Sequence, residues 1–355
     1  MRKYRNQILA GLAIAFLIYI GLLALIDTQQ LINHLQTYPW VLLIPVVLLK
    51  VLSWGLHFLK WQYYLGVIGA RDKISVRDSL VLFVSGFTLA VSPGKIAEVL
   101  KAVVLKAKTG VPIARSIPVV VAERVIDGTS VLTIVFAALL LGGSTLNIDQ
   151  WVRAFIFFAA SLIAVGLIAV QIKPLAYWLL GIVGKLPLIK RIHKPLIEFY
   201  ESTREVFQLK HVLITTLFGA LAYTIDSFGM TIVLSGFGLP FTWTLFLQTM
   251  FIFGFTAAFG ALSGSPNGAG TTEVSSGTLY ASMIAPLNPV FDTSAIAAAV
   301  LVGGFLYKWL RVLVGMAVAV IFRKRLFTPS VETAIAEMEA EKTHATEYST
   351  ESKSA

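Results

Sequence analysis

Two short polar stretches interrupt long apolar segments of this chain and restrict how those segments can fold. Residues 92–98 read Ser-Pro-Gly-Lys-Ile-Ala-Glu, and residues 265–273 read Ser-Pro-Asn-Gly-Ala-Gly-Thr-Thr-Glu. Each combines a helix-breaking proline with glycine and ends at a glutamate. A helix that breaks within a membrane exposes backbone amides and carbonyls that hydrocarbon cannot satisfy, so breaks occur where protein or water covers them, usually at a transport site. The two stretches are therefore the first candidates for a functional site.

The composition places those segments in lipid. Hydrophobic residues occupy 57% of the 355 positions, charged residues only 14%, and the mean hydropathy is +0.79. A soluble domain carries about a quarter charged residues. The net charge of +10 comes mostly from basic residues between apolar runs, where they orient segments and meet anionic headgroups, so we expect no nucleic-acid partner.

Groups that carry covalent or metal chemistry are scarce in this sequence. The chain has no cysteine, which excludes disulfides, thiolate metal sites and a thiol nucleophile. Its five histidines are scattered without the spacing of metal ligands. We therefore expect no catalytic residue, no metal and no cofactor.

The first half of the chain predicts two spans and a hairpin. Basic residues precede an apolar run at 8–26, which is long enough to cross and is interpreted as an uncleaved helix that starts in the cytoplasm. An external loop is expected at 27–38, and a second span at 39–58 ends on basic residues from Lys60 to Arg77. Residues 80–108 break too early to cross and have basic residues at both ends, so they predict a re-entrant hairpin that enters from the cytoplasm.

Four further spans are predicted in the rest of the chain, at residues 116–141, 154–170, 212–234 and 295–322. Residues 173–210 mix basic and apolar side chains and predict a cytoplasmic segment with helices on the anionic inner leaflet; it is interpreted as an interfacial linker, with a lipid-headgroup receptor as the alternative. Residues 245–285 predict a second hairpin, which enters from outside and breaks at 264–270. The tail at 326–355 is expected to be disordered and cytoplasmic.

The two halves contain the same elements in the same order but in opposite directions. Residues 1–145 give two spans, a hairpin from inside and a long charged span, and residues 150–325 give two spans, a hairpin from outside and a long charged span. This order is typical of an inverted-topology repeat, whose broken helices meet near the midplane. We therefore predict an all-α polytopic integral membrane protein with about six spanning helices and two re-entrant broken-helix hairpins. We expect it in the cell membrane, with both termini in the cytoplasm.

The residues of the first break suit an anion. After Pro93 and Gly94 a new helix starts, and its free amides and positive dipole end favour negative charge. Lys95 adds a cation at the same point. Glu98 and Lys101 are three apart, so they share a helix face and can neutralise one another.

The residues of the second break suit close contact with a ligand. Gly268 and Gly270 let the backbone approach it. Thr271 offers a hydroxyl, and Glu273 lies in the first turn of the following helix. The alternative is that these glycines only permit tight packing of helices. Two breaks in corresponding positions, each followed by a glutamate, favour a functional site.

Charged residues also lie inside the long span at 116–141. Glu123 and Asp127 are four apart, and Arg124 is one turn from Asp127. An unpaired charge at mid-membrane costs about 2.5–3.5 kcal/mol on insertion scales. The three residues therefore predict a paired cluster.

The last span carries Lys308 and Arg311 one turn apart, and snorkelling to the interface is the alternative for Arg311. For the single charges Lys50 and Asp226, structural pairing and function are equally open. The breaks and the charged spans together predict one polar site. Its candidate substrate-binding residues are Pro93, Gly94, Lys95, Glu98, Lys101, Glu123, Arg124, Asp127, Pro266, Asn267, Gly268, Gly270, Thr271, Glu273, Lys308 and Arg311.

The order of these motifs resembles the lysylphosphatidylglycerol synthase transmembrane, or flippase-like, family, which includes the membrane half of the multiple peptide resistance factor proteins. The similarity covers about residues 8–325, and the motifs are more specific for the family than for a substrate. It implies movement of a lipid such as aminoacylated phosphatidylglycerol between leaflets. The motifs that carry it are Pro93-Gly94-Lys95 with Glu98, then Glu123-Arg124 with Asp127, then a Pro-Gly-rich loop that ends at Glu273.

Two features depart from the pattern of that family. The usual Pro-Gly-Gly-x-Gly loop is here Pro266-Asn267-Gly268-Ala269-Gly270, which is expected to alter headgroup contacts. The sequence also contains no soluble aminoacyl-transferase domain, so the resemblance does not imply synthesis of lysylphosphatidylglycerol.

Three functions fit this sequence. We favour a translocase that moves an anionic phospholipid or lipid-linked precursor between leaflets through a polar cavity, with membrane lipids as partners and a homo-oligomer left open. A secondary transporter of a small anionic solute would share the inverted repeat. A membrane-embedded lipid-modifying transferase or hydrolase would need an acid and a base, for which Glu123 and Asp127 are the available carboxylates. A lateral, lipid-facing opening would favour lipid over solute.

Overall fold

The computed structural model describes residues 28–91, 99–143, 146, 148–183, 193–326, 328, 329, 331 and 333. Three parts of the sequence-based prediction lie outside the described residues. They are the first span at 8–26, the first break at 92–98 and nearly all of the tail.

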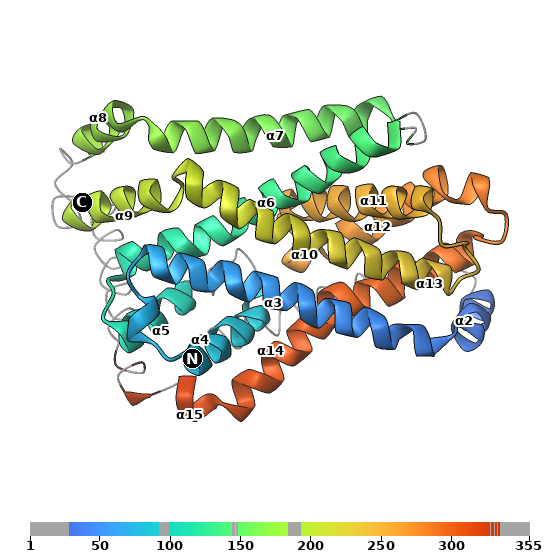
Figure 1. Ribbon diagram of the computed structural model, residues 1–355, viewed down its shortest axis with the longest axis horizontal. Coiled ribbons are helices and arrows are strands. Elements are labelled where there is room, and N and C mark those ends of the chain that lie inside the picture. Colours follow the sequence, from blue (N-terminus) through green and yellow to red (C-terminus); the bar gives the residue numbers. More distant parts are fainter. Residues whose placement is uncertain are drawn as a thin grey trace, which may run out of the picture.

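The described residues form a bundle of helices and contain no strand (Figure 1). Six of the helices are long and apolar enough to cross a membrane, which agrees with the expectation of a polytopic membrane protein. They are α3 with the short turn η1 before it (Trp40–Val67), α6 (Ile113–Gly142), α7 (Gln150–Gln171), α10 (Leu209–Ser235), α11 (Trp243–Leu262) and the segment from α13 to α14 (Thr293–Ile321).

Five of these six helices correspond to spans predicted from the sequence, and the sixth is α11. The sequence predicts α11 as the entering arm of a hairpin, but its 20 residues are enough to cross the hydrocarbon by length, since a helix rises about 1.5 Å per residue. The last span is also less regular than expected. It consists of α13 (Thr293–Gly304), a π-helical turn η8 (Phe305–Trp309) and α14 (Leu310–Ile321).

Two expectations for the N-terminal part of the chain were wrong. A helix, α2 (Thr28–Thr37), occupies the expected external loop, and Gln30 in it accepts a hydrogen bond of 3.1 Å from Ser294 at the start of α13. Helix α3 (Leu43–Val67) continues past the predicted end at residue 58. Lys60 therefore lies inside the bundle with 1% of its surface exposed, and not at the basic landing beside the membrane.

A pair of helices flanks each predicted break. The first pair is α4 (Val76–Ser85), which continues into η3 (Gly86–Val91), and α5 (Val99–Thr109). The second pair is α11 and α12 (Thr271–Met283), which pack on each other and are joined through the turn η6 (Pro266–Gly268). The turns η3 and η6 contact each other, so the described segment that precedes the first break lies against the second break. Their orientation relative to a membrane, and the inverted repeat, stay predictions.

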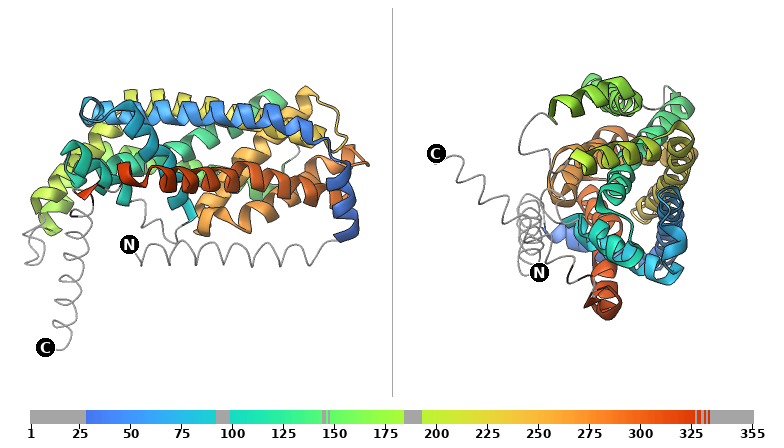
Figure 2. Two further views of the ribbon diagram at one scale, coloured as in Figure 1. Left: turned by 90° about the horizontal axis from the view of Figure 1, so that it is seen from below. Right: turned by 90° about the vertical axis from the view of Figure 1, so that its left-hand side faces the viewer.

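Several short helices gather at one end of the elongated bundle, opposite the end that carries α2 (Figures 1 and 2). Within the expected interfacial segment lie α8 (Lys173–Val183) and α9 (His193–Val206). Helix α9 packs on α6, where the Ser202 hydroxyl donates to the Arg115 carbonyl at 3.1 Å. The last short helix, α15 (Arg323–Leu326), contacts α4, and Arg325 lies 3.5 Å from Asp78.

The apolar core is divided along the length of the bundle. One cluster includes Phe251, Phe255 and Val135, and the other includes Trp61 and Leu105. Helices α3, α6 and α10 contribute to both clusters. The stretches of these helices between the two clusters carry polar residues, so the fold holds a polar layer within an apolar bundle.

Close packing of α11 on α6 at Gly254 offers a test of this arrangement. A Cβ at Gly254 would lie 2.8 Å from Val135 and 3.0 Å from the Val131 carbonyl oxygen, which is backbone and cannot move aside. We expect Gly254→Val to cost about 1–3 kcal/mol by overpacking and to lower the melting temperature of the purified protein in detergent. Gly166→Ala on the exposed face of α7 is the control, because nothing lies within 4 Å of its added Cβ. Equal melting temperatures of the Gly254→Val and Gly166→Ala variants would contradict close packing of α11 on α6 at Gly254.

Candidate functional site

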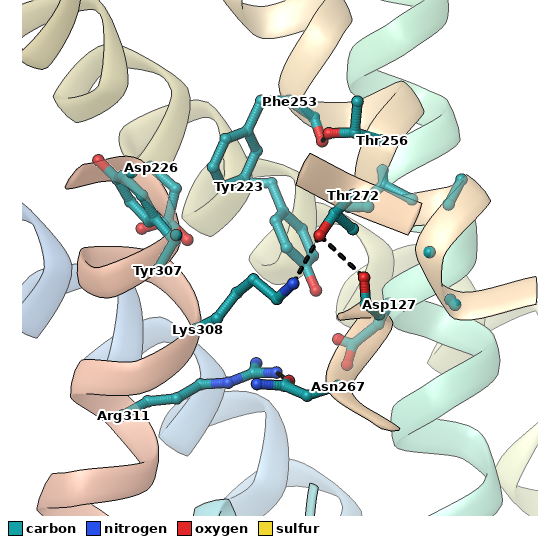
Figure 3. A pocket seen from close by; sticks show the side chains of 18 of the residues that line it. Asp127, Tyr223, Asp226, Phe253, Thr256, Asn267, Thr272, Tyr307, Lys308 and Arg311 are labelled. Carbon is teal, nitrogen blue, oxygen red and sulfur yellow. Dashed lines mark hydrogen bonds between the residues drawn. The ribbon is translucent and has the colours of Figure 1, made fainter. Parts of the chain in front are cut away.

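A cavity of about 350 Å³ lies in the polar layer, where α3, α6, α10, α12 and the α13–α14 segment converge (Figure 3). Its size is that of a small ligand site. Its wall is rich in ionisable side chains, although the surrounding helices are apolar. The ionisable side chains other than tyrosine are Lys50, His57, Lys60, Lys101, Glu123, Arg124, Asp127, Asp226, Glu273, Lys308 and Arg311.

Each of the four lysines in the wall is paired with a different carboxylate. Every pair joins two separate elements, so each also ties the bundle together across the cavity. The pairs and their Nζ–O distances are Lys50–Asp226 at 2.7 Å (α3 to α10), Lys60–Asp127 at 2.5 Å (α3 to α6), Lys101–Glu123 at 2.7 Å (α5 to α6) and Lys308–Glu273 at 2.6 Å (η8 to α12). Buried charges need such partners because removal from water is costly.

Lys101 is held by an aromatic ring as well as by a carboxylate. Its Nζ lies 3.7 Å from the centre of the Trp61 ring and donates to Glu123. A cation over the face of a tryptophan is attracted by the ring quadrupole. The sequence predicts Glu98 as the partner of Lys101, but Glu98 lies outside the described residues.

Three basic side chains lie close to the Asp127 carboxylate. Besides Lys60, its carboxylate lies 3.5 Å from Arg124 and 3.8 Å from His57. The sequence predicts a cluster of Glu123, Arg124 and Asp127. The structure places Arg124 beside Asp127, while Glu123 turns to Lys101.

The second break is a tight loop whose backbone requires unusual dihedral angles. Gly264, Gly268 and Gly270 all have positive φ, and Asn267 adopts φ 53° and ψ 24°. Asparagine is one of the few side-chain-bearing residues that visits this left-handed region readily. Asn267 therefore fits a left-handed position that glycine favours without breaking the loop conformation.

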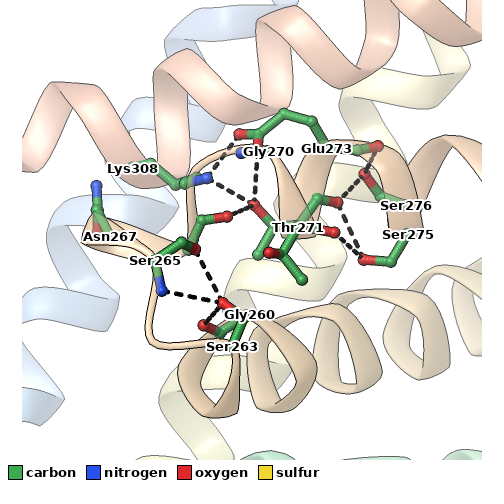
Figure 4. Close-up of polar contacts among 12 residues, drawn as sticks. Gly260, Ser263, Ser265, Asn267, Gly270, Thr271, Glu273, Ser275, Ser276 and Lys308 are labelled. Carbon is green, nitrogen blue, oxygen red and sulfur yellow. Dashed lines mark hydrogen bonds and ion pairs between the residues drawn. The ribbon is translucent and has the colours of Figure 1, made fainter. Parts of the chain in front are cut away.

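Glu273 closes this loop onto the last span (Figure 4). Its Oε2 accepts from the Gly270 amide at 2.8 Å and from the Thr272 hydroxyl at 3.0 Å, which satisfies polar groups at the start of α12. Its Oε1 accepts from Lys308, and Lys308 also donates to Thr272 at 2.6 Å. The carboxylate thus connects the break, α12 and the π-helical turn.

Arg311 turns into the protein. Its Nη2 donates to the side-chain oxygen of Asn267 at 2.6 Å, and both residues line the cavity (Figure 3). The alternative for Arg311 was snorkelling, in which the side chain extends toward the membrane surface. Its side chain instead points to the cavity. A glycine at 267 could not accept this bond.

Several buried polar atoms of the cavity wall have no hydrogen-bond partner among the described residues. These atoms are Trp54 Nε1, Asp226 Oδ1, Asn267 Nδ2, Tyr307 OH and Arg311 Nε. A buried polar group without a partner costs about 1–3 kcal/mol. Their concentration at one cavity indicates that a polar ligand or water completes it.

Most of the predicted site residues that the structure describes lie in the cavity wall. They are Lys101, Glu123, Arg124, Asp127, Asn267, Gly268, Glu273, Lys308 and Arg311. Gly270, before α12, and Thr271, its first residue, are not among the residues that line the cavity, and the side chain of Pro266 lies outside the described part of the chain. Pro93, Gly94, Lys95 and Glu98 lie outside the described residues.

Part of the α3 wall was not predicted from the sequence. Lys50, Trp54, His57 and Lys60 all line the cavity, and their spacing of three or four residues places them on one helix face. This spacing is visible in the sequence, but the sequence predicts Lys60 at the basic end of the second span and indicates no role for His57 beyond the absence of metal-ligand spacing. No group of three or more metal-ligating residues occurs in the described part of the chain.

The model of the family described as the lysylphosphatidylglycerol synthase TM region matches residues 8–315. No curated protein matches this chain.

A double-mutant cycle on Lys101 and Glu123 tests whether the buried pairs hold the site together. Removing one partner strands the other, so Lys101→Met and Glu123→Gln should each lower the free energy of unfolding by about 3–5 kcal/mol, and the double variant by much less than their sum. The control cycle uses Arg115 and Glu205, a pair 3.3 Å apart with both side chains more than 40% exposed, where about 0–1 kcal/mol of coupling is expected. Additive losses at Lys101 and Glu123 would refute a structural pair.

Proposed function

This chain belongs to the lysylphosphatidylglycerol synthase transmembrane-region family, and we propose that it moves an anionic, phosphate-bearing lipid between the leaflets of the cell membrane without changing it chemically. The family links the chain to lipid metabolism or transport, and six helices are suited to crossing a membrane. Membrane lipids are then both its surroundings and its substrate.

The single observation that carries the proposal is the position of the cavity. It lies between two apolar clusters, at the level where the turns η3 and η6 meet, and is lined by paired charges. A lipid headgroup cannot cross hydrocarbon unaided because losing its hydration is costly. A polar cavity inside the bundle offers the headgroup a substitute for water while the acyl chains stay in lipid.

The same geometry favours transport over covalent chemistry. A general acid or base must be able to give or take a proton from the substrate. Glu123 and Asp127, the candidates for these roles, each accept a hydrogen bond from a lysine at 2.7 Å or less. Carboxylates held in this way suit charge compensation, so we propose that the protein is not an enzyme.

The pairing of the lysines also suits a transporter that must be stable when no substrate is bound. In the empty state each lysine is neutralised by its own carboxylate, so the cavity does not hold four uncompensated cations in a poorly screened interior. An incoming anion therefore does not meet four bare cations that would hold it tightly. This arrangement allows binding that is selective without being too tight for release.

Labelling of introduced cysteines tests the proposed orientation, in which both termini are cytoplasmic and the two broken pairs enter from opposite faces. The chain has no cysteine of its own. Lys73, Lys106 and Val290 are exposed at turns or at helix α5, and we expect Lys73→Cys and Lys106→Cys to react from the cytoplasmic side and Val290→Cys from the outside. Labelling of the first two from opposite sides would refute the first hairpin.

Reconstitution into liposomes tests translocation directly. Tail-labelled phosphatidylglycerol in one leaflet should become accessible in the other, as measured by chemical quenching of the label. Glu273→Gln leaves Lys308 without its carboxylate, so we expect a rate about tenfold lower, which corresponds to ~1.4 kcal/mol in the barrier.

Arg115→Gln, on the exposed pair away from the cavity, is the matched control and should retain the rate. A chemically altered lipid after incubation would contradict the proposal in favour of an enzyme. Uptake of a soluble anion without lipid movement would contradict it in favour of a secondary transporter.

A further inference from the structure

Arg311 differs from the lysines and from Arg124 in the cavity wall, because no carboxylate of the described residues pairs with it. Each of the four lysines has its own carboxylate, and Arg124 lies 3.5 Å from Asp127. Within the described part of the chain, the Arg311 guanidinium donates to the side-chain oxygen of Asn267 at 2.6 Å and to no carboxylate. An amide oxygen accepts a hydrogen bond but brings no negative charge. These residues therefore leave the charge of Arg311 uncompensated.

The position of Arg311 makes the lack of a counter-charge costly. The residue lies within the α13–α14 segment (Thr293–Ile321), one of the six helices suited to crossing a membrane. An unpaired cation inside a span is unfavourable, and such residues usually mark the path of a substrate or ion. The Nε atom of Arg311 is also buried and has no acceptor among the described residues. Because the wall supplies a carboxylate for every lysine and none for Arg311, we expect the missing counter-charge to come from a ligand.

Asn267 orients the guanidinium and keeps a donor of its own free. Arginine can only donate, so the side-chain oxygen of Asn267 must face Arg311, and the amide nitrogen must point elsewhere. That nitrogen is buried and has no partner in the described residues. Asn267 lies in the second break, and both side chains line the cavity (Figure 3). Together they offer one positive charge and two unsatisfied nitrogen donors, which suit an oxyanion and do not suit a cation.

We propose that Arg311 binds the phosphate of the lipid headgroup, and that Asn267 positions the guanidinium and adds its amide as a further donor. This inference rests on the proposed function and assigns the residues that receive the phosphate. Guanidinium groups bind phosphate oxygens through charge-assisted hydrogen bonds, frequently two in parallel. One negative charge is enough to compensate Arg311. The bound phosphate contacts both the second break and the last span, which Glu273 and Lys308 also connect.

Binding to the full-length protein in detergent tests the inference with short-chain lipids that share acyl tails. The lipid probes are phosphatidylglycerol and diacylglycerol, of which only the first carries a phosphate, and glycerol phosphate represents a free-phosphate source. We expect phosphatidylglycerol to bind at least about tenfold more tightly than diacylglycerol. Equal affinity for the two lipids would overturn the inference. Glycerol phosphate that binds as tightly as phosphatidylglycerol would overturn the assignment to a lipid.

Asn267→Asp separates a binding role of Arg311 from a purely structural one. Aspartate tolerates the left-handed backbone at this position and gives Arg311 a carboxylate, so the link to the break is kept while the uncompensated charge and the amide donor are lost. We expect affinity for phosphatidylglycerol about tenfold lower, unchanged affinity for diacylglycerol, and a melting temperature no lower than that of the wild type. Wild-type affinity for phosphatidylglycerol would overturn the site.

Asn33→Asp is the matched control for this variant. It adds the same negative charge at an exposed position of α2 that does not line the cavity, so binding should not change. An equal loss of affinity in Asn33→Asp and Asn267→Asp would show a general effect of charge and would overturn the site.

Substitution of Arg311 itself keeps the inference testable if Asn267→Asp does not fold. Arg311→Gln strands no carboxylate, since none of the described ones pairs with Arg311, and should lower affinity for phosphatidylglycerol by about tenfold or more. Arg311→Lys keeps the charge without the planar fork, so its affinity should lie between those of Arg311→Gln and the wild type. Wild-type affinity in Arg311→Gln would overturn the inference.

The liposome assay separates this inference from the proposed function. If Arg311→Gln binds and moves phosphatidylglycerol as the wild type does, the phosphate site fails and translocation stands. If phosphatidylglycerol binds through Arg311 but no lipid moves, translocation fails and the site stands.

Discussion

Pairing of buried charges is the constraint on which the rest of this structure depends. An apolar bundle in a low-dielectric environment cannot hold isolated lysines and carboxylates, because each charge would lose its hydration without a partner of opposite sign to compensate it. Each lysine of the cavity finds a carboxylate on another element, and these contacts link α3 to α6 and α10, α5 to α6, and the last span to α12. The positions of the helices and the chemistry of the cavity are therefore set by the same bonds.

The loop at the second break shows how one side chain can add polar contacts while keeping the backbone conformation that the loop requires. Asn267 adopts the left-handed backbone conformation that the loop requires, so the chain path is kept. Its side chain then adds an oxygen that anchors Arg311 and a nitrogen that faces away from it. Asn267 therefore has two roles: its backbone adopts the conformation that the loop requires, and its side chain forms part of the polar cavity wall.

Much of the fold follows from the sequence, because span length and hydropathy are local properties. Five of the long helices, the family and the loop before Glu273 are predictable for this reason. The pairing is not local: Lys50 and Asp226 are 176 positions apart, and no periodicity shows which carboxylate a given lysine meets. Lys60 was misplaced for the same reason. A rule that counts basic residues at the ends of spans assigns it to the membrane surface, whereas Asp127 on another helix keeps it inside.

The separation of the Lys50 pair along the chain has a consequence for how the protein is made. Helix α3 leaves the ribosome long before α10, so Lys50 enters the membrane when Asp226 has not yet been synthesised. A lysine at the centre of an inserting helix costs about 2.5–3.5 kcal/mol, which the apolar remainder of α3 must outweigh during insertion. The mature ion pair forms only after α10 arrives. Because of the order of translation, α3 enters the bilayer while the Lys50 charge has no partner. The charge is neutralised only when α10 packs on α3 and brings Asp226 to it.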